Sequence, residues 1–223
     1  MKKFGVDWRF CPECQKIQHY IVNDVATGSA TEWSHCNHDY RPNSAKAVLE
    51  NQAKELEELG LPSYPVRTYQ SPHELEGFVK FAGNFVPFYP VIVEIGSFHG
   101  GTANRLMEYF DPEKLICVDR CFDFWLADGL DCVKILGDSV ASLDAVKQAL
   151  AGKDIDLLFI DGDHSYRGEM ADYRAYSPLV RDGGVIALHD THSIPDVGRV
   201  FAEIPGKVKV DIFSYQGIGF VVK

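Results

Sequence analysis

From residue 91 to the end of the chain, short apolar runs alternate with amphipathic stretches of helical period. The pattern predicts strands near residues 91–95, 115–119, 132–136, 155–160, 184–189, 207–213 and 217–222, and helices near residues 101–110, 139–151, 167–180 and 196–203. Strands that alternate with helices form a mostly parallel sheet. The last two strands lie too close together for a helical crossover, so we expect an antiparallel hairpin there. The sequence therefore predicts an α/β fold built on a seven-stranded, mostly parallel sheet.

The residues before this sheet have a helical pattern. An incomplete apolar stripe over residues 45–59 predicts one helix, which ends at Gly60. A second helix should start at Ser71, because Pro72 follows in the first turn and Glu74 stands three residues on, in the capping-box arrangement. We expect a small first segment, a helical linker or cover, and the sheet domain, over residues 1–42, 43–90 and 91–223.

Cysteine and histidine residues form two short motifs near the start of the chain. Cys11 and Cys14 enclose a proline and a glutamate, and about twenty residues later His35, Cys36 and His38 lie close together. Thiolate and imidazole are the ligands that tetrahedral zinc prefers. The two motifs resemble a zinc ribbon, with one structural zinc held by Cys11, Cys14 and two of the other three residues. The alternative is a pair of buried cysteines beside exposed histidines.

Composition narrows the classes of partner. The chain has 223 residues and a formal net charge of −10, which argues against a broad nucleic-acid surface because such surfaces are rich in Lys and Arg. No apolar run approaches the ~20 residues of a membrane span, and no signal-peptide core follows the first residues. We expect a cytoplasmic protein with no nucleic-acid or membrane partner and with a small-molecule or protein partner. The sequence does not fix the oligomeric state, and a homo-oligomer is possible.

A glycine-containing turn follows the first strand of the sheet domain. Glu94 ends this strand, and Gly96, Ser97 and Gly100 follow before the next helix. Gly96 can adopt a positive φ and lets a ligand approach the backbone. Open α/β sheets bind ligands at the carboxyl edge, so Glu94 can accept hydrogen bonds from a ribose or an amino group. The spacing is not the Gly-x-Gly-x-x-Gly of dinucleotide folds, and it resembles the first motif of class I S-adenosylmethionine-dependent methyltransferases.

Acidic residues also follow the second and third strands. The family resemblance implies that Asp119 binds the ribose hydroxyls and that Asp138 accepts from the adenine amino group, while Ser139 should cap the next helix. Local roles are the alternative, since Asp138 and Ser139 suit a helix N-terminus and Asp119 suits a loop. The candidate cofactor-binding residues are Glu94, Gly96, Ser97, Gly100, Asp119, Asp138, Ser139 and Asp161.

The candidate chemistry lies after the fourth and fifth strands. Asp161 and His164 follow the fourth, and His189 and Asp190 end the fifth. Oxygen ligands on neighbouring strands suit Mg²⁺ or a similar divalent ion, and an imidazole suits proton abstraction at neutral pH. This pairing resembles metal-dependent O-methyltransferases of the catechol and macrolide-sugar types, in which carboxylates at the positions of Asp161 and Asp190 hold the metal. In the macrolide-sugar type a histidine at the position of His164 acts as the base.

The chain departs from these families beside the second carboxylate. Their neighbouring residue is Glu or Asn, whereas Asp190 is flanked by His189 and Thr191. The third metal ligand is therefore open, and His189 would favour a softer ion than Mg²⁺.

The resemblance implies a Rossmann-like fold and metal-assisted methylation of a small-molecule hydroxyl by S-adenosylmethionine, with His164, Asp161 and Asp190 as the catalytic residues. A Rossmann-type oxidoreductase is one alternative, although its glycine motif is absent. The other is a non-catalytic zinc-ribbon adaptor with a degenerate nucleotide-binding domain, which would bind no cofactor.

Overall fold

A computed structural model describes residues 5–11, 16–24, 29–33, 53–60, 66 and 68–223. The chain divides into two compact units, Met1–Ser63 and Tyr64–Lys223. The first unit holds an antiparallel sheet of β1 (Gly5–Cys11), β2 (Lys16–Asp24) and β3 (Ser29–Trp33), and residues 53–58 are helical. The side chains of the proposed zinc ligands lie outside the described residues, so that site stays a prediction: Cys11, Cys14, His35, Cys36 and His38.

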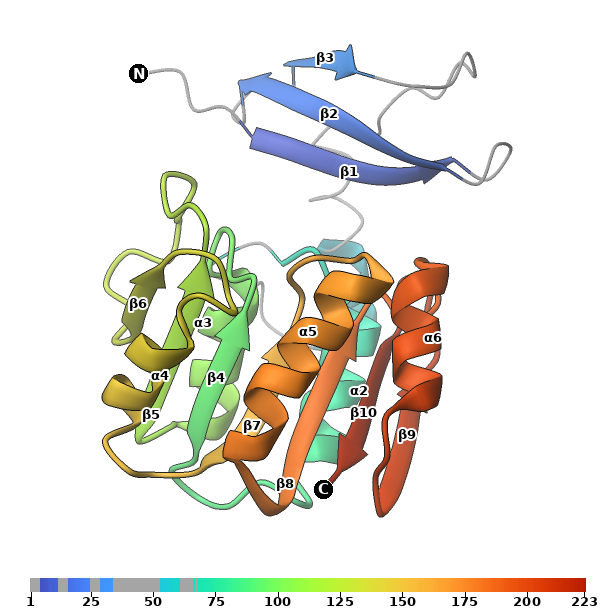
Figure 1. The fold of residues 1–223 in the computed structure, drawn as a ribbon. Coiled ribbons are helices and arrows are strands. Elements are labelled where there is room, and N and C mark those ends of the chain that lie inside the picture. The colour runs from blue at the N-terminus through green and yellow to red at the C-terminus, as the bar shows by residue number, and fades with distance from the viewer. Residues whose placement is uncertain (1–4, 12–15, 25–28, 34–52, 61–65, 67) are drawn as a thin grey trace. The chain divides into compact units, whose positions relative to one another are not determined.

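The second unit is built on a seven-stranded sheet with the order β6-β5-β4-β7-β8-β10-β9 (Figure 1). Its strands are β4 (Val91–Ile95), β5 (Lys114–Asp119), β6 (Val133–Leu136), β7 (Ile155–Ile160), β8 (Val180–His189), β9 (Val208–Ile212) and β10 (Ile218–Val222). Strands β4 to β8 are parallel, and β10 pairs antiparallel with both β8 and β9. The predicted fold class, a Rossmann-like sheet that ends in an antiparallel hairpin, is confirmed.

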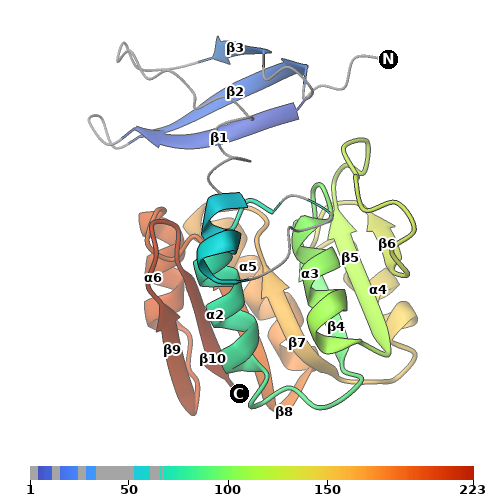
Figure 2. The same cartoon turned by 180° about the vertical axis from the view of Figure 1, so that it is seen from behind.

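Helices cover both faces of this sheet. Helices α2 (Pro72–Ala82) and α3 (Gly101–Phe110) pack on one face, and α4 (Leu143–Leu150), α5 (Tyr166–Tyr176) and α6 (Pro195–Glu203) pack on the other (Figure 2). Side chains alternate across a strand, so Ile92 joins the core under α2 and α3 while Val93 joins the core under α4 to α6. None of the described helices combines the length and apolarity of a membrane span.

Local sequence explains where several elements begin and end. The capping box at the start of α2 is confirmed: the Ser71 hydroxyl accepts from the Glu74 amide, and the Glu74 carboxylate accepts from the Ser71 amide. Helix α5 ends at Tyr176, earlier than predicted, and a 3₁₀ turn over Ser177–Leu179 contains Pro178. A proline lacks the amide hydrogen that would continue the helix.

The turn after β4 brings two strand ends together. Gly96 has φ 83°, and the Asp161 amide donates to the Ile95 carbonyl at 2.8 Å. A Cβ on Gly96 would lie 1.9 Å from the Asp161 carbonyl oxygen. Glycine is therefore required here because the loop after β7 lies against its backbone, whereas the predicted approach of a ligand to Gly96 stays a prediction.

This contact predicts that substitution of Gly96 costs more stability than substitution of Gly129, although both glycines have nearly the same positive φ. Gly129 has φ 85° and open space around its Cβ position. We expect Gly129→Ala to lower the free energy of unfolding by about 1–2 kcal/mol, which is the cost of a left-handed alanine. Gly96→Ala should lower it by about 3–5 kcal/mol, because overpacking against Asp161 adds to that strain. Denaturant unfolding of the two variants measures the difference, and equal losses would contradict the contact.

Candidate active site

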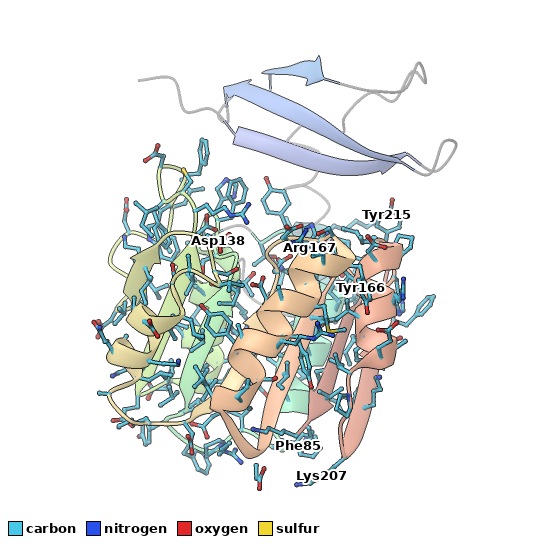
Figure 3. All side chains as sticks on the ribbon, viewed as in Figure 1. Phe85, Asp138, Tyr166, Arg167, Lys207 and Tyr215 are labelled. Atoms are coloured by element: carbon cyan, nitrogen blue, oxygen red, sulfur yellow. The ribbon has the colours of Figure 1, made fainter. Side chains whose placement is uncertain are left out.

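The residues predicted to carry chemistry follow the parallel strands, so they gather at the carboxyl edge of the sheet. Figure 3 marks this edge with Asp138, Tyr166, Arg167 and Tyr215, whereas Phe85 and Lys207 lie at the opposite end. Ligands of open α/β sheets bind at the carboxyl edge. Two groups of side chains occupy it: one beyond β7 and β8, and one beyond β4, β5 and β6.

Asp161, His164 and Asp190 form the centre of the first group. Each offers one ligand atom, and the three atoms lie within 4.8 Å of one another. His164 Nε2 is 3.1 Å from Asp161 Oδ1 and 3.6 Å from Asp190 Oδ2. Asp190 sits at φ 63°, and the Ser193 hydroxyl donates to its Oδ1. The structure thus brings together the three residues that the sequence proposes as catalytic.

His189 lies beside this centre and is almost fully buried. Its Nδ1 is 3.2 Å from Asp161 Oδ1 and 3.5 Å from Asp190 Oδ2, and its Nε2 is 3.2 Å from Glu74 Oε1. Burial alone would lower its pKa, but the surrounding carboxylates Asp161 and Asp190 raise the pKa well above its usual value. Both ring nitrogens of His189 face carboxylates. Its side chain is 1% exposed, whereas that of His164 is 26% exposed.

The electrostatics of the centre follow from these contacts. Burial alone would raise the pKa of Asp161, but His189 and His164 lower it below the usual range of a carboxyl. Burial alone would lower the pKa of His164, but hydrogen bonding to Asp161 and the charge of Asp190 raise it above 6.5. Without a metal the two carboxylates therefore favour the protonated form of both imidazoles, and any proton held there offsets part of the carboxylate charge.

Two further acids lie on the inner face of α5. Both carboxyl oxygens of Glu169 are buried and have no hydrogen-bond partner among the described residues. Burial, followed by the charges of Asp161 and Asp172, raises the pKa of Glu169 well above its usual value. Asp172 accepts from the Ser139 hydroxyl at 2.5 Å, and burial raises its pKa to about 6. This excess of buried acid favours a cation at the centre, and two carboxylates with an imidazole suit a divalent metal ion.

The second group begins with Glu94 at the end of β4. Glu94 is 1% exposed, and its Oε2, like the Ser97 hydroxyl, is buried with no hydrogen-bond partner in the described part of the chain. Burial raises the pKa of Glu94 to about 8, so at neutral pH this carboxyl mostly carries a proton. Glu94 can then donate as well as accept a hydrogen bond. Ser97 and Cys117 lie close enough to Glu94 to offset part of this rise in pKa, so Glu94 and Ser97 are neighbours that can both turn to a ligand with hydroxyl or amino groups.

Asp119 organises the loops around this position. Its Oδ2 accepts from the Phe98 amide at 2.7 Å, and its Oδ1 accepts from the Cys121 amide at 2.8 Å. The loop after β5 also packs on the start of α3, because a Cβ on Gly100 would lie 2.8 Å from side-chain atoms of Trp125. Asp119 therefore ties the turn after β4 to the loop after β5, and its remaining lone pairs stay available to a ligand.

Asp138 has the local role that was the alternative to cofactor binding, whereas Ser139 differs from expectation. Asp138 forms an exposed ion pair with Arg120 at 2.8 Å, and its Oδ1 accepts from the Ala141 amide. These hydrogen bonds, the Ala141 amide first, lower the pKa of Asp138. Helix α4 starts four residues after Ser139, whose hydroxyl donates to Asp172 instead. The prediction that Ser139 caps α4 is therefore wrong, because residues 139–142 form a turn and the N-cap position of α4 falls on Ser142.

Sequence reasoning missed three residues of the first group. Gln70 donates from Nε2 to Asp161 Oδ2 at 2.9 Å, Glu74 faces His189, and Glu169 is buried beneath the centre. Glu74 was noticed only as a helix cap. Glu169 had a signal in the sequence, since Glu169 and Tyr176 share one face of an amphipathic helix at helical spacing. Gln70 had none.

Comparison with known proteins agrees with the fold. Residues 93–191 match the family model of a methyltransferase domain. A curated relative, an uncharacterized protein of Acanthamoeba polyphaga mimivirus, is 30% identical over 146 residues, which cover 57% of this chain and 66% of the relative. The match thus spans just under two thirds of that protein's length.

Three solved structures show the same architecture. The O-methyltransferase from Bacillus cereus in complex with S-adenosylhomocysteine (SAH) has a TM-score of 0.54 at 18% identity, over 79% of this chain and 91% of that chain. The O-methyltransferase TomG from Streptomyces achromogenes, in complex with S-adenosylmethionine, has a TM-score of 0.54 at 16% identity, over 78% and 88%. The methyltransferase MycE of mycinamycin biosynthesis, with Mg, SAH and mycinamycin VI, has a TM-score of 0.50 at 16% identity, over 87% and 65%. Residues 93–191 therefore resemble a methyltransferase domain, and the chain shares the fold of these S-adenosylmethionine-dependent O-methyltransferases.

Proposed function

We propose that this protein transfers a methyl group from S-adenosylmethionine to a hydroxyl of a small molecule, with the help of a divalent ion such as Mg²⁺. The observation that carries the proposal is the convergence of Asp161, His164 and Asp190 at the carboxyl edge of a methyltransferase fold. Related folds support it, since solved neighbours hold S-adenosylmethionine or SAH and one of them holds Mg.

The cofactor would lie beyond β4, β5 and β6. Glu94 and Ser97 present buried polar atoms that lack a partner among the described residues, and Asp119 fixes the loops on either side. The cofactor supplies a methyl group that its sulfonium already activates. The protein's task at this edge is therefore to bind and orient, and Glu94, with a pKa of about 8, can both donate to and accept from the ligand.

Asp161 and Asp190 would hold the metal, with His164 or His189 able to complete the set. A bound divalent ion lowers the pKa of a coordinated hydroxyl and fixes its position. His164 is the better base of the two histidines, because its side chain is 26% exposed whereas that of His189 is 1% exposed with Nε2 against Glu74. A base needs reach to the proton that it removes. His164 thus takes the proton, and His189 holds Asp161 and Asp190 in place.

The first test compares two aspartates of the same loop. Asp161→Asn should weaken Mg²⁺ or Mn²⁺ binding by about 100-fold or more, because it removes a proposed ligand, and outer-shell substitutions alone cost about 10–100-fold. Asp163→Asn is the control, since Asp163 is exposed and its hydrogen bond within the described part of the chain comes from the Ser165 amide. Asp163→Asn should change neither metal affinity nor SAH affinity. Calorimetry measures all of these quantities.

Two results would contradict the proposal in different ways. Wild-type protein that binds neither S-adenosylmethionine nor SAH would exclude a methyltransferase and favour the adaptor. Equal metal affinity in wild type and Asp161→Asn would contradict the metal site at Asp161. The proposal of a methyltransferase would then stand without a metal at this centre.

The pH dependence of metal binding gives a second test. The carboxylates around His164 and His189 raise the pKa of both imidazoles, so in the metal-free protein each keeps its proton to a higher pH than a free histidine does. A histidine must lose its proton to ligate or to accept a proton, so metal and protons compete. Mn²⁺ affinity should therefore rise with pH from about 6 to about 8, by up to about tenfold per pH unit for each proton released. Affinity that is constant across this range would contradict the enclosed, protonated histidines.

We further propose a structural zinc ion in the first unit, held by Cys11 and Cys14 with two of His35, Cys36 and His38. Thiolate and imidazole at this spacing support it. Elemental analysis should find one zinc ion per chain in wild type and none in a Cys11→Ser, Cys14→Ser double variant, while Cys121→Ser should retain it. Wild-type protein purified without zinc would remove this proposal and leave the methyltransferase proposal untouched.

A further inference from the structure

The segment just before α2 reaches into the centre that holds Asp161. Gln70 is 1% exposed, and its Nε2 donates to Asp161 Oδ2 at 2.9 Å. We propose that Gln70 is a positioning residue: it fixes the carboxylate of Asp161 so that Oδ1 faces His164 and Asp190, where the metal would bind. This inference rests on the proposed function, and it adds a residue that lies 91 positions away from Asp161 in the chain.

The orientation of the Gln70 amide is itself fixed. The Thr102 hydroxyl donates to Gln70 Oε1 at 2.7 Å, and the Thr68 hydroxyl donates to the Gln70 carbonyl at 2.9 Å. Because a hydroxyl donor holds Oε1, the amide presents its NH₂ group to Asp161. Thr102 lies in the first turn of α3, so two elements on one face of the sheet cooperate in holding this side chain.

The start of α2 is anchored as firmly. Glu74 Oε1 accepts from the Ser71 amide at 2.9 Å and faces His189. Its Oε2 accepts from the Ser214 hydroxyl and from the Gly217 amide at 3.1 Å. One buried carboxylate therefore ties the helix start to β8 and to the turn between β9 and β10. Gln70 directly precedes this anchored turn and has little freedom to move away from Asp161.

The two oxygens of Asp161 consequently have different partners. Gln70 occupies Oδ2, while Oδ1 is 3.1 Å from His164 Nε2 and 3.2 Å from His189 Nδ1. A carboxylate without a fixed partner can rotate about its last torsion angle, whose energy wells are broad. A hydrogen bond to the oxygen that faces away from the metal removes this freedom, and such outer-shell bonds are worth about 10–100-fold in metal affinity.

The experiment measures the affinity of the full chain for Mn²⁺ alone, by calorimetry or by electron paramagnetic resonance, and its affinity for SAH. Gln70→Leu removes the amide at similar volume, and Thr102→Val removes the hydroxyl that orients it. We expect Gln70→Leu to weaken Mn²⁺ binding by about 10–100-fold and Thr102→Val to weaken it less. The double variant should be no weaker than Gln70→Leu, because Thr102 acts through Gln70. SAH affinity should stay within about twofold in all of them.

Two controls separate positioning from general destabilisation. Glu76→Gln weakens another tie between α2 and α3, the buried ion pair with Arg105 at 2.6 Å, without touching the centre. It should lower the thermal midpoint while Mn²⁺ affinity stays at the wild-type value. Thr102→Ser keeps a hydroxyl and should restore the affinity that Thr102→Val loses, which gives a test that does not depend on the folding of Gln70→Leu.

The outcomes distinguish this inference from the proposed function. Wild-type protein that binds Mn²⁺ while Gln70→Leu and Thr102→Val bind it equally well would overturn the role of Gln70 and leave the metal site standing. A Glu76→Gln variant that loses as much affinity as Gln70→Leu would also overturn it. Wild-type protein that binds no Mn²⁺ would overturn the metal part of the proposed function and this inference together.

Discussion

The carboxylate of Asp161 is mostly shielded from water, and much of the structure around it serves to keep it there. A buried carboxylate is costly unless hydrogen bonds and opposite charge compensate it. Gln70 holds one oxygen, and His164 and His189 face the other. These partners come from the segment before α2, from the loop after β7 and from the end of β8. The side chain can therefore be ionised only when three separate parts of the chain are in place.

The backbone imposes the same convergence. The β4–β7 ladder continues one residue beyond the strands, where the Asp161 amide donates to the Ile95 carbonyl. This hydrogen bond presses the loop after β7 onto Gly96, which only a glycine tolerates. Consequently the turn that begins the cofactor edge and the loop that carries Asp161 and His164 are packed against each other. The group beyond β4, β5 and β6 and the group beyond β7 and β8 are therefore in direct contact, and a substitution at Gly96 should disturb both.

The sequence was sufficient for elements whose signals are local. Apolar runs bounded by glycine, proline and acidic residues placed all seven strands of the sheet, and the end of each strand placed Asp161, His164 and Asp190 at one edge. The start of α4 was misplaced because a turn over residues 139–142 precedes the helix, and the contact of Ser139 is instead a hydrogen bond to Asp172 on a different helix. Gln70 was missed for the same reason, since nothing near it in the sequence indicates an acceptor 91 residues away. Long-range hydrogen bonds leave no periodic pattern.

Charge balance explains how so many acids can be buried at this edge. Asp161 and Asp190 raise the pKa values of His164 and His189 and so favour protons that offset their own charge, while burial and acidic neighbours raise the pKa of Glu169 and favour its neutral form. A divalent ion carries the same charge as the two protons that those histidines can release. Exchanging the ion for the protons therefore leaves the net charge of the centre unchanged, so Glu169 need not alter its own protonation. The same arrangement of buried acids would therefore suit both the protonated centre and the metal-bound centre that we propose.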